Sequence, residues 1–197
     1  MITTPKIILA SKSARRKEIL EHLGLNPTII VSNADENVSE KLTPERFVEE
    51  VSRRKAEAVR HLCAENDLII ASDTVVYCED KILGKPRDEK EALEMLSLLS
   101  GTTHSVTSGL AIIYKGRTVL SHETTEVTFR KISEKEALDY VHTNEPYDKA
   151  GGYGIQDRAS VFTEKISGDY LNVVGLPVYR LFSVLKKEYG IDFFDLI

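Results

Sequence analysis

The chain has 197 residues, of which 42% are hydrophobic and 29% charged, a composition typical of a soluble globular protein and a length that fits one domain. Its formal net charge of −5 disfavours binding to a nucleic acid polymer or an anionic membrane, so a phosphate site must be a local basic pocket. No apolar run approaches the roughly 20 residues that span a bilayer. The segment Met1–Lys6 lacks the pattern of an export signal, and the two cysteines and five histidines lack metal-ligand spacing. We therefore expect a cytoplasmic protein without a zinc site.

The first informative segment is Ile7–Leu20, which begins as an apolar run and becomes amphipathic. The run predicts a buried strand, and 16–23 predicts a helix that ends at Gly24. In open α/β sheets, ligands bind where a strand passes into a helix, and a helix N-terminus attracts anions.

Four polar side chains lie at this predicted turn: Ser11, Ser13, Arg15 and Arg16. Hydroxyl donors and planar guanidinium groups suit phosphate oxygens, so they indicate a polyphosphate site. The alternative is a solvated arginine pair that binds nothing. The residues alone do not favour one interpretation over the other.

The other predicted elements follow in chain order. They are a strand over 28–31, a helix from Thr43–Pro44, strands over 68–71 and 75–77, a helix over 89–100, strands over 105–114 and 118–129, a helix after Ser133, strands over 159–166 and 170–174, and a helix from Pro177. This alternation predicts an α/β protein with a mixed sheet. In the helix from Thr43, we expect Phe47, Val51, Ala58 and Leu62 to face the core, with Lys55 close to that stripe.

Asp73 lies between two apolar, strand-like runs, where an uncompensated carboxylate is costly to bury. It is either a hydrogen-bonded turn residue or a carboxylate that holds a divalent metal or polarises water. Glu36, in the polar loop 32–37, is by itself an ordinary loop acid. Lys85 stands between Gly84 and Pro86 in a rigid loop, and we favour a phosphate contact over a plain surface lysine.

The segment 147–156 carries three glycines within four residues, which indicates tight backbone geometry or close approach of a ligand. A plain flexible loop is the alternative. Tyr153 offers an aromatic face for stacking on a base, and the amide of Gln156 can partly match a uracil or thymine edge.

Several of these motifs together resemble the Maf family, small nucleotide pyrophosphatases of the ITPase-like structural group. The matching segments are the serine–arginine turn at 11–16, then 71–76, 84–86, 148–156 and 173–177, in order along nearly the whole chain. The resemblance implies a single domain over 1–197, with a long twisted mixed sheet flanked by helices and two lobes around a central cleft. One departure is Asp157–Ala159, where the family has a glycine-rich run after the glutamine.

The resemblance also implies a reaction and a set of site residues. It implies hydrolysis of the α–β phosphate bond of dTTP and UTP, with Asp73 as proton acceptor and Mg²⁺ or Mn²⁺ held by Glu36 and Asp73. Which carboxylate binds the metal and which takes the proton stays open. The substrate-binding and specificity residues are Ser11, Arg15, Arg16, Lys55, Thr74, Lys85 and Gln156. The resemblance to this family also implies a possible homodimer.

Two other functions are compatible with the same residues. One is a house-cleaning pyrophosphatase that removes modified nucleotides. The other is a nucleotide-binding regulator of cell division that does not turn its ligand over, although a pure binder needs no water-activating carboxylate.

Overall fold

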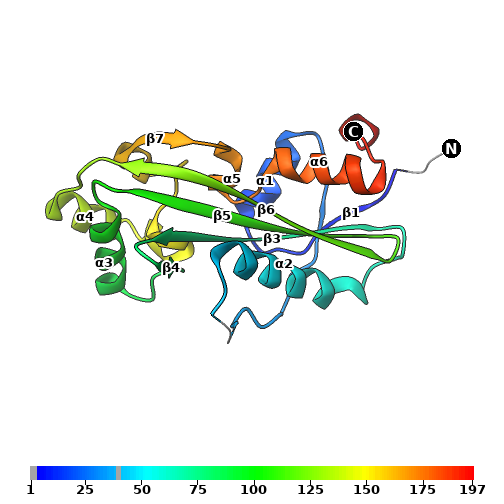
Figure 1. The fold of residues 1–197 in the computed structure, drawn as a ribbon, viewed down its shortest axis with the longest axis horizontal. Coiled ribbons are helices and arrows are strands. Elements are labelled where there is room, and N and C mark those ends of the chain that lie inside the picture. Colours follow the sequence, from blue (N-terminus) through cyan, green and yellow to red (C-terminus); the bar gives the residue numbers. More distant parts are fainter. Residues whose placement is uncertain (1–3, 39–40) are drawn as a thin grey trace. The chain divides into compact units, whose positions relative to one another are not determined.

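The computed structural model describes residues 4–38 and 41–197, so part of the Met1–Lys6 segment discussed above lies outside the described residues (Figure 1). Its strands are β1 (Ile7–Leu9), β2 (Thr28–Ile29), β3 (Leu68–Cys78), β4 (Lys81–Leu83), β5 (Thr103–Tyr114), β6 (Arg117–Phe129) and β7 (Thr163–Ser167). Its α-helices are α1 (Ala14–His22), α2 (Pro44–Arg60), α3 (Glu89–Leu99), α4 (Glu134–Val141), α5 (Tyr170–Val174) and α6 (Val178–Tyr189). The 3₁₀ segments in this part of the chain are η1 (Glu145–Asp148), η2 (Ala150–Gly152), η3 (Arg158–Phe162) and η4 (Phe193–Asp195).

The strands form one seven-stranded mixed sheet in the order β2-β1-β3-β5-β6-β7, with β4 paired to β3. β1 runs parallel to both neighbours, whereas β4 and β7 pair antiparallel. The predicted α/β fold with a mixed sheet is therefore confirmed. None of the helices in the described part of the chain is both long enough and apolar enough to span a bilayer.

The chain divides into two compact units, and three of the strands contribute to both. Unit 1 comprises Met1–Asp73, Ser108–Glu123 and Gly175–Ile197, and unit 2 comprises Thr74–Thr107 and Thr124–Val174. The assignment of 1–197 to a single domain stays a prediction.

The core of unit 1 follows from the alternation of side chains along its strands. Ile8, Ile69 and Ala111 point to one face, where they pack against Ala56 and Val59 of α2. Within this unit, α2 lies on one side of the strands, whereas α1 and α6 lie on the other (Figure 1). The first helix ends as predicted, because Gly24 adopts a φ of +82° and the amide of Leu25 bonds the Leu20 carbonyl.

The predicted core stripe of α2 is wrong except at Val51. Leu62 lies beyond the helix and is 61% exposed, and Phe47 and Ala58 are only half-buried. The buried residues of the helix are Val48, Glu49, Val51, Ser52, Lys55, Ala56 and Val59. The cause is tertiary: a Cβ on Gly109 of β5 would lie 2.4 Å from the Val48 carbonyl group, so the α2 backbone rests directly on the sheet at that point.

In unit 2, the two strands predicted over 159–166 and 170–174 are only partly confirmed. The structure has a strand at β7, preceded by the 3₁₀ segment η3, and 170–174 is the helix α5. Asp169 starts this helix, because its Oδ1 accepts the amides of Leu171 and Asn172 at 2.8 and 3.2 Å. The β-branched residues of α5 favoured a strand in the sequence, but this capping interaction outweighs that preference.

Candidate functional site

The turn between β1 and α1 has the features of an anion site. Ser11 is buried, and its Oγ accepts a 3.1 Å hydrogen bond from the amide of Ser13. The helix starts at Ala14, its N-cap Ser13 makes no side-chain capping bond, and its first turn carries no acidic residue. The first turn therefore contains no carboxylate that would compete with a bound anion for the helix N-terminus.

Arg16 is buried in unit 1 and bonds the protein itself. Its Nε donates to the carbonyl of Gly175 at 2.7 Å, and its Nη1 donates to Ser11 Oγ at 3.4 Å. Burial lowers the pKa of Arg16, while the negative charge of Asp73 acts in the opposite direction. Ser72 Oγ donates to the same Gly175 carbonyl at 3.3 Å. One carbonyl therefore joins three of the segments that the sequence singled out.

Asp73, Lys55 and Glu36 form the charged centre of unit 1. Lys55 Nζ lies 2.7 Å from Asp73 Oδ1 and 3.2 Å from Glu36 Oε2. The side chains of Lys55 and Asp73 are only 11% and 14% exposed, whereas that of Glu36 is 55% exposed. Lys55 reaches this position from the buried face of α2, and its expected role in substrate binding stays a prediction. Two carboxylates thus converge on one ammonium group.

Asp73 does not lie in a turn, as one interpretation of the sequence had it. β3 runs without a break from Leu68 to Cys78, and Asp73 is a half-buried residue within it. Ionic pairing with Lys55 compensates the burial that made this position costly on sequence grounds alone.

The loop that carries Glu36 is held by a neighbouring arginine. Arg54 of α2 donates through Nη1 to the carbonyls of Asp35 and Asn37 at 3.2 and 2.8 Å. Asp35 Oδ1 accepts the amide of Asn37 at 2.9 Å, a bond that lowers the pKa of Asp35. Glu36 is therefore presented between two anchored residues, a feature that sequence analysis missed because nothing in the pattern of α2 distinguishes Arg54 from its neighbours.

The predicted metal ligands are Glu36 and Asp73. Across 4–38 and 41–197, no group of three or more His, Cys, Asp or Glu side chains is arranged to hold a metal ion. Mg²⁺, however, is commonly held by one or two carboxylates together with substrate phosphates and water. The convergence of Asp73 and Glu36 on one cation fits a site of that kind, which the substrate would complete.

Unit 2 carries three of the predicted residues. Thr74 is half-buried in β3, while Lys85 and Gln156 are exposed. The loop of Lys85 is joined to the glycine-rich segment, because the amide of Gly151 donates to the Gly84 carbonyl at 2.9 Å. The structure thus brings together, within this unit, the lysine loop and the segment that leads to Gln156.

The glycine-rich segment is closely packed. Gly151 has a φ of +66°, and a Cβ there would lie 2.8 Å from Val76 Cγ2. Tyr153 is only 5% exposed, its hydroxyl lies 2.8 Å from His104 Nε2, and its ring packs edge-on against Phe129. The prediction that Tyr153 stacks on a base is therefore wrong: its ring belongs to the core, and burial raises its pKa.

The predicted residues are thus divided between the units. Unit 1 holds two bonded sets, one formed by Ser11 and Arg16 at the turn and the other by Lys55, Asp73 and Glu36. Arg15, half-buried, follows the same turn. Sequence analysis missed Ser72, Arg54 and the Gly175 carbonyl, although the position of Ser72 directly before Asp73 was a usable signal.

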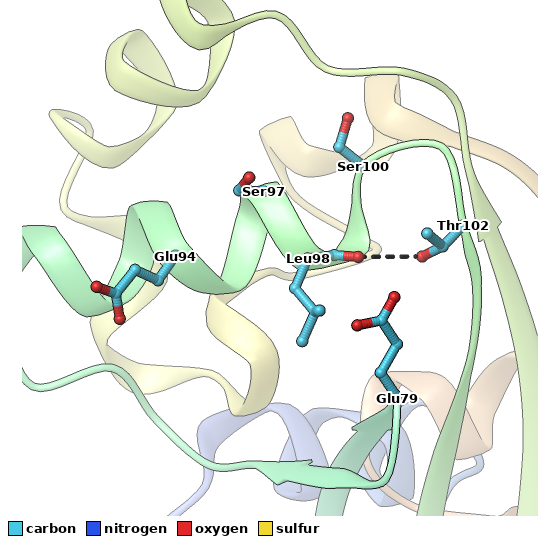
Figure 2. A pocket seen from close by; sticks show the side chains of 6 residues that line it. All are labelled: Glu79, Glu94, Ser97, Leu98, Ser100 and Thr102. Carbon is cyan, nitrogen blue, oxygen red and sulfur yellow. Dashed lines mark hydrogen bonds between the residues drawn. The ribbon is translucent and has the colours of Figure 1, made fainter.

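A surface pocket of unit 2 lies elsewhere, between the β3–β4 turn and the end of α3 (Figure 2). Its lining consists of Glu79, Glu94, Ser97, Leu98, Ser100 and Thr102, and the Thr102 hydroxyl donates to the Leu98 carbonyl. Two carboxylates and no cationic side chain line it, so it does not suit a polyphosphate. None of the predicted site residues belongs to it.

Comparison with known proteins adds an independent result. The family described as Maf-like protein matches residues 6–188. Proteins named dTTP/UTP pyrophosphatase from Bacillus cereus (strain AH820) and Thermoanaerobacter sp. (strain X514) are 50% and 45% identical to this chain. The alignments cover 95% and 94% of it, and 97% and 98% of those proteins. Among solved structures, the Ham1 protein of Staphylococcus aureus matches with a TM-score of 0.46 and 16% identity, over 63% of this chain and 71% of that one. The chain belongs to the Maf family.

Proposed function

We propose that this protein is a nucleoside triphosphate pyrophosphatase that hydrolyses dTTP and UTP to the nucleoside monophosphate and pyrophosphate. The observation that carries the proposal is the Asp73–Lys55–Glu36 cluster, which lies in the same unit as the Ser11–Arg16 turn. Near-full-length similarity to proteins named dTTP/UTP pyrophosphatase supports the choice of substrate.

Asp73 acts as the proton acceptor. Lys55 binds its Oδ1, which orients the carboxylate that takes a proton from the attacking water. The water oxygen bonds to the α-phosphorus, the bond from this phosphorus to the α–β bridging oxygen breaks, and its electron pair leaves with pyrophosphate. The proton released from water goes to Asp73.

Glu36 and Asp73, together with phosphate oxygens, would hold Mg²⁺ or Mn²⁺. When bound, such an ion neutralises part of the charge that develops on the phosphates. In unit 1, Ser11 and Arg15 are assigned as phosphate contacts. Arg16 contributes positive charge to this phosphate site, while its Nε donates to the Gly175 carbonyl. For Lys85 of unit 2, the phosphate contact stays a prediction from the sequence.

Gln156 of unit 2 recognises the base, with Thr74 of the same unit. The specificity role of Arg15, in unit 1, stays a prediction from the resemblance. The Gln156 amide both donates and accepts, which suits the alternating acceptors and donor of a uracil or thymine edge. Its exposure leaves the amide accessible to a ligand.

We also propose that the enzyme works in the cytoplasm, as a homodimer, on small nucleotides rather than nucleic acid polymers. Both cysteines, Cys63 and Cys78, are free thiols, which fits a reducing compartment. The acidic net charge argues against polymer binding.

The decisive experiment measures pyrophosphate release from dTTP, UTP, CTP and the purine triphosphates, with and without Mg²⁺ or Mn²⁺. We expect metal-dependent release that is fastest with dTTP and UTP. Release that is fastest with a purine triphosphate would contradict the base assignment. Binding of nucleotides without any release would contradict the enzymatic proposal.

A further inference from the structure

We propose that Lys149 is a positioning residue for base recognition, which fixes the loop that presents Gln156 and thereby sets the preference for uracil and thymine. The inference rests on the proposed function, because it assigns a cause to the selectivity of Gln156. Every residue that carries it lies in unit 2.

Lys149 is a lysine that the structure buries, with only 8% of its side chain exposed. Burial of an ammonium group is costly unless the charge is paired and hydrogen-bonded. Here Nζ donates to the Glu145 carbonyl at 2.9 Å and to Asp148 Oδ1 at 2.7 Å, both in η1. It also lies 3.4 Å from Asp157 Oδ2. Lys149 therefore bridges η1 to the residue that directly follows Gln156.

Gly154 shows how closely the loop packs on this bridge. A Cβ at this position would lie 2.6 Å from Lys149 Cε and 2.4 Å from Asp157 Oδ2. The backbone of Gly154 does not have a positive φ, so glycine is needed here for space rather than for its conformational freedom. The Asp157 amide then donates to the Gly154 carbonyl at 3.1 Å, which closes a tight turn that contains Gln156.

A second bridge secures the same end of the turn, one residue after Asp157. The Arg158 guanidinium forms an ion pair with Glu145 of η1, and the Arg158 amide donates to Glu145 Oε2 at 3.2 Å. The C-terminal end of the turn is thus tied twice to η1, while Gln156 itself is exposed. A recognition amide held in this way loses little conformational freedom on binding, which favours discrimination between similar bases.

The competing interpretation is that Lys149 only stabilises unit 2. The two interpretations differ in what a substitution does to base selectivity, since a loss of stability lowers the folded fraction equally for every substrate. Inorganic tripolyphosphate, tested as a competitive inhibitor, reports the phosphate site without a base.

The test compares Lys149→Met with the wild type and with Lys165→Met, which alters an exposed lysine of β7 in the same unit. We expect Lys149→Met to lower kcat/KM for dTTP by roughly tenfold or more, mainly through KM, because a displaced Gln156 amide loses its contact with the base. The value for dCTP should change much less, and inhibition by tripolyphosphate should match that of Lys165→Met.

Asp157→Asn and Gly154→Ala provide two further perturbations of the bridge, in case Lys149→Met does not fold. Each should reduce the dTTP-to-dCTP preference in the same direction. An unchanged preference in any folded variant of this set, with dTTP and dCTP rates lowered in parallel, would overturn the inference and leave the proposed function intact. A wild-type enzyme without preference for dTTP or UTP would instead overturn the proposed base recognition, and this inference with it.

Discussion

Lys55 donates a 2.7 Å hydrogen bond to Asp73 from the buried face of α2. The same ammonium group lies 3.2 Å from Glu36, so it neutralises one of two carboxylates that would otherwise repel each other. Because α2 is anchored on β5 at Gly109, the packing of unit 1 determines where this ammonium group lies. The charged centre thus depends on helix–sheet packing as much as on its own ionic contacts.

The first prediction concerns Lys55→Met, which keeps the apolar stem and removes the charge. We expect a loss of pyrophosphate release of roughly 10²-fold or more, because Asp73 loses the group that orients it and the two carboxylates face each other unpaired. Steady-state kinetics with dTTP measure the effect. The control is Lys17→Met on α1, which removes only a surface pair with Glu21 and should retain full activity. Equal activity in the two variants would contradict the role of Lys55.

The second prediction separates the two carboxylates. Asp73→Asn should reduce kcat by about 10²–10⁴-fold, the usual contribution of a general base, while nucleotide binding survives. Glu36→Gln should instead raise the Mg²⁺ or Mn²⁺ concentration needed for half-maximal rate, since Glu36 would bind the ion. Turnover at the wild-type rate in Asp73→Asn would remove Asp73 from the mechanism.

Local sequence patterns predicted much of unit 1 correctly. β1 and α1 could be predicted from an apolar run, the serine–arginine turn that follows it and the glycine that ends the helix. Burial and capping there are local effects, so the local sequence contains the information. Position 73 was harder: the sequence suggested a turn between two strands, whereas the ion pair with Lys55 allows β3 to run through it. The partner lies 18 residues away on another element, and no local pattern contains that information.

Tyr153 shows the same limit in unit 2. Its position among glycines suggested an exposed ring, but the hydroxyl pairs with His104 on β5 and the ring joins Phe129 on β6. The predicted core-facing residues of α2 were wrong for a related reason. The contact between Gly109 and Val48 determines which side of the helix faces the sheet. In each case, a contact between segments distant in sequence decided which side chain is available to a ligand.

The third prediction tests the anchoring of Arg16. Arg16→Lys keeps the charge but cannot reproduce both the bond to the Gly175 carbonyl and that to Ser11, so it leaves a buried acceptor with fewer donors. We expect a loss of about 1–3 kcal/mol in the free energy of unfolding, together with a raised KM for dTTP. Ser72→Ala, which removes only the longer 3.3 Å bond to the same carbonyl, should cost about 1 kcal/mol. Urea denaturation measures both, and equal losses would argue against a special role for the guanidinium.

The fourth prediction concerns Gly109→Ala. The added Cβ would overlap the Val48 carbonyl, so α2 must shift, and overpacking of this kind costs about 1–3 kcal/mol or more. Because Lys55 lies two turns further along the same helix, the activity should fall as well. Gly84→Ala is the matched control for stability, since a Cβ there meets nothing within 4 Å and the backbone is not strained. A thermal midpoint for Gly109→Ala equal to that of Gly84→Ala would contradict this account of the helix packing.

The fifth prediction concerns pH. Burial beside Tyr153 and Phe129 lowers the pKa of His104 from 6.5 to about 4. The unfolded chain therefore binds a proton at His104 between pH 6.5 and 4 that the folded protein does not, and stability must fall as the pH drops through this window. Between pH 7 and 5, this proton uptake should lower the free energy of unfolding by about 2 kcal/mol, since each pKa unit corresponds to about 1.4 kcal/mol. Arginine partners lower the pKa values of Glu50 and Glu136 from 4.5 to about 2. These two residues therefore stabilise the fold fully above pH 4.5, and that stabilisation is lost only at lower pH. Urea denaturation at pH 7 and pH 5 should thus show a loss in the wild type that His104→Gln, which has no group to protonate there, largely lacks. A similar loss in both proteins would show that other groups cause the pH dependence.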